Sequence, residues 1–426
     1  MRQTAEMKVT IHGGSRAAVI ALPASKSLSH RALICAALSE GTAVIHHVAE
    51  NKDTEATMRV MSHLGASFER KEDDVIVHGS RTLPYDGSVL DCGESGSTLR
   101  FLIPLFSLGS DTVTFTGHGR LMERPQSVYE ALYHENGLLF VKEGQYLKVR
   151  GPLTGGTYTV DGSVSSQFIS GLLFALPEVK QDSRITVKEP YESRSYVGLT
   201  LDLLRKSGII INEEGNTYFI PGRQSYALKE ASIAGDDSQM AFFAAKGLSG
   251  REPVEVIHVD HDSKQGDHII LAYIRKMGGR YEETEQGYRF YPSKLHGCEM
   301  DLGDCPDLGP MLFALAATAE GTSHFVHAGR LRVKESDRIA CMEEELKKLG
   351  CHMKSEQEEV WIEGTETLQD GMTLHGHNDH RIVMSLSILS ALLHNTCIEG
   401  AEAVDKSYPA FFKDLETCGC EVEYDQ

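Results

Sequence analysis

A cluster of cationic and hydroxyl side chains opens a run of sequence that is typical of a buried helix. The run 32–38 is apolar on nearly all sides, which predicts burial. The helix dipole is positive at this end and disfavours cations there, so an anion bound among the side chains would explain them. A solvated first turn with ion pairs is the alternative on this segment alone. The polar residues of the first turn are Lys26, Ser27, His30 and Arg31.

Polar helix starts of this kind recur at a constant distance along the chain. The steps between them are 70, 70, 71, 70 and 72 residues, taking as markers Lys26, Gly96, Ser166, Asp237, Asp307 and Asp379. A second set of markers, glycines that follow amphipathic helices, has steps of 72, 71, 70, 72 and 69 residues and consists of Gly65, Gly137, Gly208, Gly278, Gly350 and Gly419. Two independent markers with one period predict six copies of one α/β unit.

Each copy is expected to contain a helix, a strand, a second helix and one or two short closing strands. Five closing strands are visible, at 75–79, 147–151, 218–222, 288–292 and 360–364, but the sixth copy reaches the end of the chain without one. A matching strand stands at 9–13, so we expect the N-terminal strand to complete the last copy. Six copies divide into two domains of three. We expect one domain to span 21–234 and the other to combine 1–20 with 235–426.

Composition limits the classes of function. The chain has 426 residues and a formal net charge of −19, which argues against nucleic-acid binding. No apolar segment approaches the roughly 20 residues that span a bilayer. The nine cysteines are scattered and the first fifteen residues lack an apolar signal core, which favours reduced thiols in a cytoplasm.

Several connections carry further groups capable of chemistry. Arginines between Gly117 and Pro125 suit phosphate or carboxylate recognition, or ion pairs with Glu123. Three acids at the helix start near 307 are compatible with a divalent metal, a helix cap or a base; they are Asp301, Asp304 and Asp307. The charged segment 330–338 fits either a solvated face or an anion site with an acid–base group.

The histidines near residue 380 are of a type that binds zinc. They are His375, His377 and His380, and no cysteine or carboxylate completes a recognisable ligand spacing with them. We therefore expect no metal. Lys406 follows, and we expect it to open the last helix.

Together, these motifs resemble the 5-enolpyruvylshikimate-3-phosphate (EPSP) synthase family from about residue 8 to the end of the chain. The motifs that carry the resemblance are Ser25-Lys26-Ser27 with Arg31, Gly96-Ser97, Glu123-Arg124-Pro125, Ser165-Ser166-Gln167, Pro306-Asp307, Arg332 to Arg338, Asn378-Asp379-His380-Arg381 and Lys406. The resemblance implies a two-domain inside-out α/β barrel. Each domain would have three βαβαββ repeats, and the active site would lie in the interdomain cleft.

The family transfers the enolpyruvyl group of phosphoenolpyruvate to the 5-hydroxyl of shikimate 3-phosphate, without metal or organic cofactor. By resemblance, shikimate 3-phosphate would contact Lys26, Ser27, Arg31, Ser165, Ser166, Gln167, Ser193, Tyr196, Asp307 and Lys334. Phosphoenolpyruvate would contact Lys26, Gly96, Arg124, Gln167, Arg338, Arg381 and Lys406. Asp307 would take the hydroxyl proton, Glu335 would exchange protons with the methylene carbon, and Lys26 and His380 are further catalytic candidates. The resemblance also implies a monomer inhibited by glyphosate.

Two departures and two rival functions accompany this resemblance. Glu94 stands where many members have asparagine, and Arg330 replaces an expected asparagine or acid. The related transferase acting on UDP-N-acetylglucosamine uses a catalytic cysteine in the loop that matches 117–125, and this chain has none there. A phosphate-ligand sensor of the same fold would need neither Asp307 nor Glu335. The family's own reaction is therefore the favoured expectation.

Overall fold

The computed structural model describes residues 7–80 and 87–425, and the chain divides into two compact units. One unit is Ala24–Ala234, and the other joins the chain up to Pro23 to the chain from Gly235. The first boundary between the units lies after Pro23, three residues later than the boundary expected after residue 20. Each unit has its own hydrophobic core, and no residue is shared between the two cores described.

Three copies of one motif build the unit Ala24–Ala234. The first contains α1 (Lys26–Leu38), β3 (Gly41–His46), α2 (Lys52–Ser62), β4 (Ser67–Lys71) and β5 (Asp74–Gly79). The second contains β6 (Val89–Asp91), α3 (Gly96–Phe106), β7 (Thr112–Thr116), η1 (Leu121–Glu123), α4 (Ser127–Glu135), β8 (Leu139–Glu143) and β9 (Tyr146–Arg150). The third contains β10 (Thr157–Asp161), α5 (Ser166–Ala175), η2 (Leu176–Glu178), β11 (Ser183–Lys188), α6 (Arg194–Lys206), β12 (Asn212–Glu214), β13 (Thr217–Ile220) and β14 (Glu230–Ser232).

The other unit repeats the motif three more times. Its N-terminal part supplies β1 (Lys8–His12) and β2 (Ala18–Ala21). The fourth copy continues with α7 (Asp237–Ser249), β15 (Val254–Ile257), η3 (Gly266–Ile269), α8 (Ile270–Lys276), β16 (Arg280–Thr284) and β17 (Gly287–Tyr291). The fifth contains β18 (Glu299–Asp301), η4 (Pro306–Leu308), α9 (Gly309–Ala317), β19 (Thr322–Val326), η5 (Gly329–Val333), α10 (Arg338–Lys348), β20 (His352–Ser355) and β21 (Val360–Glu363). The sixth contains β22 (Thr373–His375), α11 (His380–Ser390), β23 (Thr396–Glu399), η6 (Ala401–Lys406), α12 (Phe411–Thr417) and β24 (Glu421–Asp425).

The described residues form six four-stranded sheets with one common topology. In each sheet a short edge strand pairs in parallel with a central strand, and two antiparallel strands follow, which form a hairpin in five of these sheets, as in the order β6-β7-β9-β8. In the last sheet, β1 takes the place of the missing closing strand and pairs antiparallel with both β23 and β24. The predicted completion of the sixth copy by the N-terminal strand is thus confirmed.

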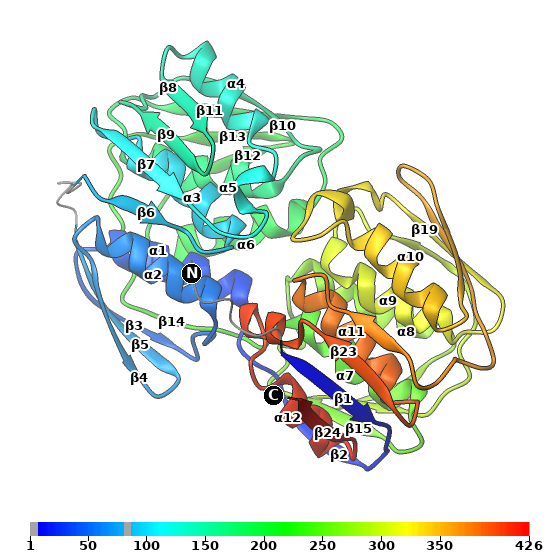
Figure 1. Ribbon diagram of the computed structural model, residues 1–426. Coiled ribbons are helices and arrows are strands. Elements are labelled where there is room, and N and C mark those ends of the chain that lie inside the picture. The colour runs from blue at the N-terminus through cyan, green and yellow to red at the C-terminus, as the bar shows by residue number, and fades with distance from the viewer. Residues whose placement is uncertain (1–6, 81–86, 426) are drawn as a thin grey trace. The chain divides into compact units, whose positions relative to one another are not determined.

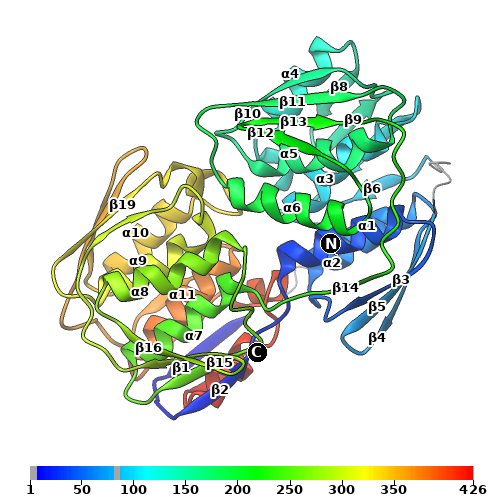
Figure 2. The ribbon, with the colours of Figure 1, turned by 180° about the vertical axis from the view of Figure 1, so that it is seen from behind.

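The helices that begin at the repeated polar turns form the interior of each unit. In α1, α3, α5, α7, α9 and α11, nearly every residue after the first turn is buried. Figure 1 shows these helices enclosed by sheets in each unit, and Figure 2 shows α6 running beside α1 and α5 from behind. This arrangement is the predicted inside-out α/β architecture. Within the described part of the chain, no helix is long and apolar enough to cross a membrane.

Two edge strands are exchanged between copies in a way that the repeat pattern did not predict. Strand β2 precedes α1 in the chain, yet it pairs in parallel with β15 of the fourth copy. Strand β14 precedes α7, yet it pairs in parallel with β3 of the first copy. The chain passes from one unit to the other twice. In both places the edge strand that precedes the passage belongs to the unit that the chain is leaving.

Candidate active site

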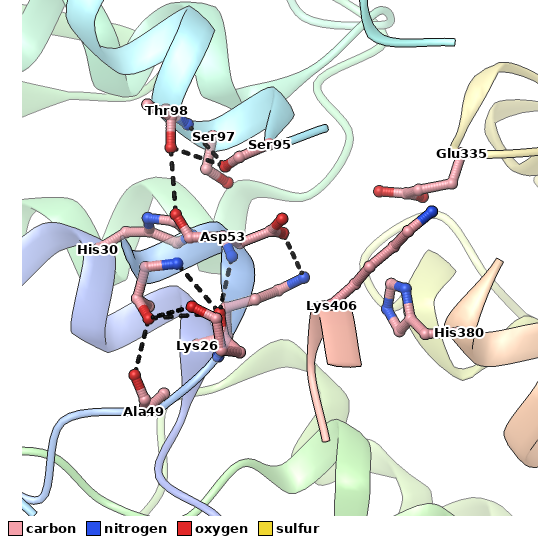
Figure 3. A network of polar contacts seen from close by, with 12 residues as sticks. Lys26, His30, Ala49, Asp53, Ser95, Ser97, Thr98, Glu335, His380 and Lys406 are labelled. Carbon is pink, nitrogen blue, oxygen red and sulfur yellow. Dashed lines mark hydrogen bonds and ion pairs between the residues drawn. The ribbon is translucent and has the colours of Figure 1, made fainter. Parts of the chain in front are cut away.

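The first group of site residues lies at the start of α1. Ser25 caps this helix by accepting a hydrogen bond from the Leu28 amide. The Lys26 ammonium donates to Asp53 Oδ2 at 2.9 Å, and Asp53 lies in the first turn of α2 (Figure 3). Both side chains are largely buried, which makes this ion pair less screened than a surface pair. Its carboxylate partner was not predicted from the sequence.

Arg31 is buried and has only neutral hydrogen-bond acceptors among the described residues. Its guanidinium donates to Thr200 Oγ1 at 2.8 Å, to the Ser27 carbonyl at 2.7 Å and to the Tyr196 carbonyl at 2.9 Å. Burial lowers the pKa of Arg31 to about 10. The structure thus brings Ser27, Arg31 and Tyr196 together, and within residues 7–80 and 87–425 no carboxylate pairs with the Arg31 guanidinium.

His30 is not a third cation of this group. Its ring is buried, and Nδ1 lies 2.8 Å from Thr57 Oγ1. Burial, followed by the charges of Lys26 and Arg31, holds the pKa of His30 well below its ordinary value. The ring is therefore neutral, and the positive charge at the start of α1 comes from the lysine and the arginine.

The starts of α3 and α5 meet through Gln167. Its amide nitrogen donates to Ser97 Oγ at 3.0 Å, and Arg100 Nη1 donates to its amide oxygen at 2.9 Å. Beside them, a Cβ added to Gly96 would lie 2.7 Å from Arg124 Nη1. Glycine at this position therefore lets the Arg124 guanidinium, which follows η1, approach the backbone of α3.

Serines also occupy the N-cap positions of α5 and α6, although only Ser165 forms a capping hydrogen bond through its side chain. Ser165 precedes α5 and accepts a hydrogen bond from the Gln167 amide, and Ser166 is the first helical residue. Ser193 precedes α6 with a φ of 52°, in the left-handed region, and it is buried. Hydroxyl groups and backbone N–H groups at helix starts suit an anionic, hydroxyl-bearing ligand.

Arg338 is the centre of the second group of site residues, in the unit that contains the C-terminal half. Its guanidinium donates to Asp379 Oδ2 at 2.9 Å, to Asp307 Oδ1 at 2.9 Å and to Glu335 Oε2 at 2.8 Å. Burial alone would lower its pKa, but the three carboxylates raise the pKa of Arg338 above its ordinary value. The predicted acid–base pair, Asp307 and Glu335, is thus held on two nitrogens of one guanidinium.

Asp307 is also the acceptor for two further cations. The Lys334 ammonium lies 3.3 Å from Asp307 Oδ1. Arg381 donates through Nη1 to the Asp307 carbonyl at 3.0 Å and through Nη2 to Asp307 Oδ2 at 3.3 Å. Burial lowers the pKa of Lys334 to about 8, and the charges of Arg330 and Arg338 oppose the effect of Asp307.

Ser238 fixes the orientation of Arg381. Its hydroxyl donates to Asp236, the N-cap residue of α7, and accepts from Arg381 Nη2 at 2.9 Å. The start of α7 is therefore part of the site through Ser238, which the sequence analysis did not identify. Asp379, the other unassigned partner, accepts from Arg338 and from the Arg381 amide.

Lys406 and His380 complete the residues that the sequence indicated. The Lys406 ammonium donates to the Asn378 carbonyl at 2.6 Å and to Asn378 Oδ1 at 2.8 Å. His380 is the first residue of α11 and is buried; Figure 3 shows both side chains with Glu335. The expectation that Lys406 opens the last helix is wrong, because Lys406 ends η6 and α12 begins at Phe411.

The three acids near residue 307 do not meet around a common point. Asp301 Oδ1 accepts from the Gly303 amide at 2.8 Å and lies 2.9 Å from His327 Nδ1, whereas Asp307 faces Lys334 and the arginines. Among the described residues they form no group with metal-ligand spacing. The metal interpretation of this loop is therefore not supported. Asp307 instead forms ion pairs with Lys334, Arg338 and Arg381.

The fold is shared with enolpyruvyl transferases of known structure. EPSP synthase from Acinetobacter baumannii superposes with a TM-score of 0.81 at 27% identity, over 99% of this chain and 100% of that chain. The enolpyruvyl transferase NikO from Streptomyces tendae superposes with a TM-score of 0.78 over 98% and 99% of the two chains. At 15% identity, the second likeness concerns the fold alone.

The sequence comparisons narrow this class to one family. The sequence model of EPSP synthase (3-phosphoshikimate 1-carboxyvinyltransferase) matches residues 12–415. The 3-phosphoshikimate 1-carboxyvinyltransferase of Clostridium kluyveri is 40% identical over 410 residues, 95% of each chain. That of Clostridium acetobutylicum is 40% identical over 412 residues, again 95% of each chain. The chain belongs to the EPSP synthase family.

Proposed function

We propose that this chain transfers the enolpyruvyl group of phosphoenolpyruvate to the 5-hydroxyl of shikimate 3-phosphate and releases phosphate. This is the 3-phosphoshikimate 1-carboxyvinyltransferase reaction of chorismate and aromatic amino-acid biosynthesis. The observation that carries the proposal is the placement of Asp307 and Glu335 on one buried guanidinium, with Lys334 and Arg381 beside Asp307. A reaction that removes one proton and adds another needs two such groups held at fixed positions.

We assign shikimate 3-phosphate chiefly to the helix starts of the unit Ala24–Ala234. A buried guanidinium with neutral acceptors is stabilised when an anion arrives, and Arg31 is of this kind. The capping serines offer hydroxyl and backbone donors to a phosphate or to ring hydroxyls. The proposed contacts are Lys26, Ser27, Arg31, Ser165, Ser166, Gln167, Ser193 and Tyr196, and the family motifs add Asp307 and Lys334.

Asp307 and Glu335 would divide the proton transfers between them. Asp307 would accept the proton of the 5-hydroxyl as its oxygen attacks, and Glu335 would protonate the methylene carbon and later remove a proton from it. Their shared hydrogen bonds to Arg338 orient both carboxylates. Lys26 and His380 are further candidates for these proton transfers. The Lys26 ammonium forms an ion pair with Asp53, and the His380 imidazole is buried.

Phosphoenolpyruvate would be held by cationic side chains, and its leaving phosphate would be stabilised by them. We assign it to Lys26, Gly96, Arg124, Gln167, Arg338, Arg381 and Lys406. Three carboxylates already neutralise much of the charge of Arg338, so this arginine serves mainly to orient Asp307 and Glu335. Arg124, Arg381 and Lys406 are then the main partners of the substrate anion. We propose that the chain acts as a monomer, as the family resemblance implies.

Glyphosate is the proposed inhibitor, competing with phosphoenolpyruvate for the same cations. A Cβ on residue 96 would lie 2.7 Å from Arg124 Nη1, so a side chain there would displace the guanidinium. We therefore propose that the inhibitor binds beside Gly96 and Arg124. Glu94 stands two residues before Gly96, and its negative charge would reduce the affinity for a dianion.

The reaction is tested by measuring phosphate release from phosphoenolpyruvate with different acceptors. Release with shikimate 3-phosphate, and none with UDP-N-acetylglucosamine, supports the proposal. Release only with the UDP-sugar would assign the chain to the rival transferase. Binding of shikimate 3-phosphate without any release, by wild type and by Asp307→Asn alike, would identify a ligand sensor.

A further inference from the structure

The described hydrogen bonds of the Arg381 guanidinium go to two residues, Asp307 and Ser238. Nη1 donates to the Asp307 carbonyl, and Nη2 donates to Asp307 Oδ2 and, at 2.9 Å, to Ser238 Oγ. In the proposed reaction Asp307 accepts a proton, and its carboxyl group then loses the charge that attracts the guanidinium. Ser238 stays neutral throughout, so it is the anchor of Arg381 that the reaction leaves unchanged.

The Ser238 hydroxyl is oriented by the first turn of α7. Ser238 is the second residue of this helix, and both its amide and its hydroxyl donate to the carboxylate of the N-cap residue, Asp236. Because the hydroxyl proton is directed at Asp236, an oxygen lone pair remains for Arg381. Helix ends fray easily, so the position of this oxygen depends on what holds the chain around the N-cap.

Two side chains from outside α7 hold the residues on either side of the N-cap. Gln265 is buried, and its Nε2 donates to the Gly235 carbonyl at 2.8 Å. His268 Nδ1 lies 3.0 Å from Asp237 Oδ2, and the Asp237 side chain has no exposed surface. Gln265 immediately precedes η3 and His268 belongs to it, so one short segment fastens the backbone before and after the N-cap. We call these two contacts the α7 clamp.

The contact between His268 and Asp237 joins an imidazole to a buried carboxylate. Burial raises the pKa of Asp237, whereas the hydrogen bond to His268 favours the ionised form, as does the positive end of the α7 dipole. The same hydrogen bond raises the pKa of His268. A charge-assisted bond of this kind is stronger than a neutral one, and its loss would leave a buried carboxylate without the imidazole.

We propose that Gln265 and His268 are positioning residues for Arg381, acting through the first turn of α7 and the Ser238 hydroxyl. This role rests on the function proposed above, in which Arg381 binds phosphoenolpyruvate. Side chains that contact a substrate are effective when neighbouring residues hold them in place before it binds. Without the α7 clamp, phosphoenolpyruvate would have to order the guanidinium itself, and its affinity would fall.

Steady-state phosphate release and titration calorimetry on the full chain test this role. Gln265→Met and His268→Leu each remove one donor of the α7 clamp. Each should raise the KM for phosphoenolpyruvate about three- to tenfold, the effect of one lost hydrogen bond, and leave shikimate 3-phosphate affinity unchanged. His268→Asn keeps a donor at this position and should restore the KM. A loss of stability alone would lower the amount of active protein and the apparent kcat, but not change the KM.

The matched control is His324→Leu, which should leave the KM unchanged. His324 belongs to the same unit and lies outside the proposed site, and its Nε2 is 2.8 Å from Glu359. This variant therefore removes a comparable contact between an imidazole and a carboxylate. An equal rise in KM in the control would overturn the proposal, because the effect would not be specific to the α7 clamp.

A double-mutant cycle tests whether the α7 clamp acts through Ser238. In Ser238→Ala the anchor of Arg381 is already lost, so adding His268→Leu should raise the KM no further. Equal effects of His268→Leu with and without Ser238, or a wild-type KM in His268→Leu, would overturn the proposal. If His268→Leu does not fold, Gln265→Met in the same two backgrounds decides between these outcomes. Absence of phosphate release by wild type would instead reject the proposed function, and this inference with it.

Discussion

Two buried arginines, one in each unit, are compensated in opposite ways. Arg31 is 2% exposed and donates to neutral oxygens, and burial lowers its pKa. Arg338 is 1% exposed and donates to three carboxylates, which raise its pKa. The guanidinium of Arg31 is a cation with no carboxylate partner in the part of the chain that the structure describes. The second is neutralised by the groups that we assign to proton transfer.

This difference indicates a division of labour between the units. An uncompensated buried cation favours the arrival of an external anion, which suits the binding of a phosphorylated acceptor. A network of carboxylates and cations near charge balance gains little from a further anion, but it holds acid–base groups in fixed positions. We therefore expect the unit Ala24–Ala234 to contribute most to the affinity for shikimate 3-phosphate and the other unit to contribute most to turnover.

The largest effect should follow from neutralising the proposed acid–base groups. Asp307→Asn and Glu335→Gln should each lower kcat about 10²- to 10⁴-fold, because a positioned proton donor or acceptor is lost. Shikimate 3-phosphate should still bind to both variants. Phosphate release gives kcat, and titration calorimetry gives the affinity. Turnover close to that of wild type would mean that the substituted carboxylate pairs with Arg338 but takes no part in proton transfer.

Removing each buried arginine tests the comparison directly. Arg338→Met leaves Asp379, which has no exposed surface, without its guanidinium and should destabilise the chain by about 3–5 kcal/mol. Arg31→Met removes a cation that has no carboxylate partner, so the ligand-free chain should lose less than about 2 kcal/mol. The latter variant should instead bind shikimate 3-phosphate about ten- to a hundredfold more weakly, since charge-assisted bonds contribute roughly 1.5–3 kcal/mol each.

Denaturant unfolding and calorimetry on the same two variants provide the measurements. Equal losses of stability would mean that Arg31 is compensated as fully as Arg338. Unchanged affinity in Arg31→Met would remove it from the acceptor site and end the proposed division of labour.

A smaller effect should follow from adding one methyl group at Gly96, in the unit Ala24–Ala234. In Gly96→Ala the new Cβ would lie 2.7 Å from Arg124 Nη1, so the guanidinium must move away. We expect a higher inhibition constant for glyphosate, a modestly raised KM for phosphoenolpyruvate and unchanged affinity for shikimate 3-phosphate. Inhibition curves at fixed shikimate 3-phosphate provide the comparison. Identical curves for the two proteins would mean that Arg124 does not hold the inhibitor, and Glu94→Asn would then be the next variant.

The smallest effect should be a dependence of acceptor binding on pH. The pKa of Lys334 is about 8 in the folded chain and higher when unfolded, so the unfolded state binds more protons between these values. This group's contribution to stability therefore rises with pH above about 8. Affinity for shikimate 3-phosphate should fall over the same range, because the ammonium is lost. Arg31 remains mostly charged up to pH 9.5, since its pKa is about 10.

Calorimetric titrations between pH 7 and pH 9.5 follow this loss, in wild type and in Lys334→Arg. The arginine variant stays charged and should abolish the decrease. A decrease that persists in Lys334→Arg would assign the titration to another group.

The sequence alone determined the features that short segments encode. The six repeats, the capped helix starts and the completion of the last sheet by β1 follow from turn residues and periodic apolar positions. Each of these signals acts over about ten residues, through capping, burial and strand pairing. The family motifs also placed candidate residues at these helix starts, because such starts carry the backbone donors that bind anions.

Only the tertiary structure decided how distant charges pair. Three hydrogen-bond partners come from elements far apart in the chain, and no sequence pattern predicts these contacts. They are Asp53 for Lys26, Asp379 for Arg338 and Ser238 for Arg381. The exchange of β2 and β14 was hidden for the same reason, since two similar edge strands fit either sheet by local pattern. His377 likewise lies 2.9 Å from Glu345, which belongs to α10 more than thirty residues earlier in the chain. Hydrogen bonds and ion pairs require contact within a few ångströms, and for residues far apart in the chain only the packing of the helices sets that distance.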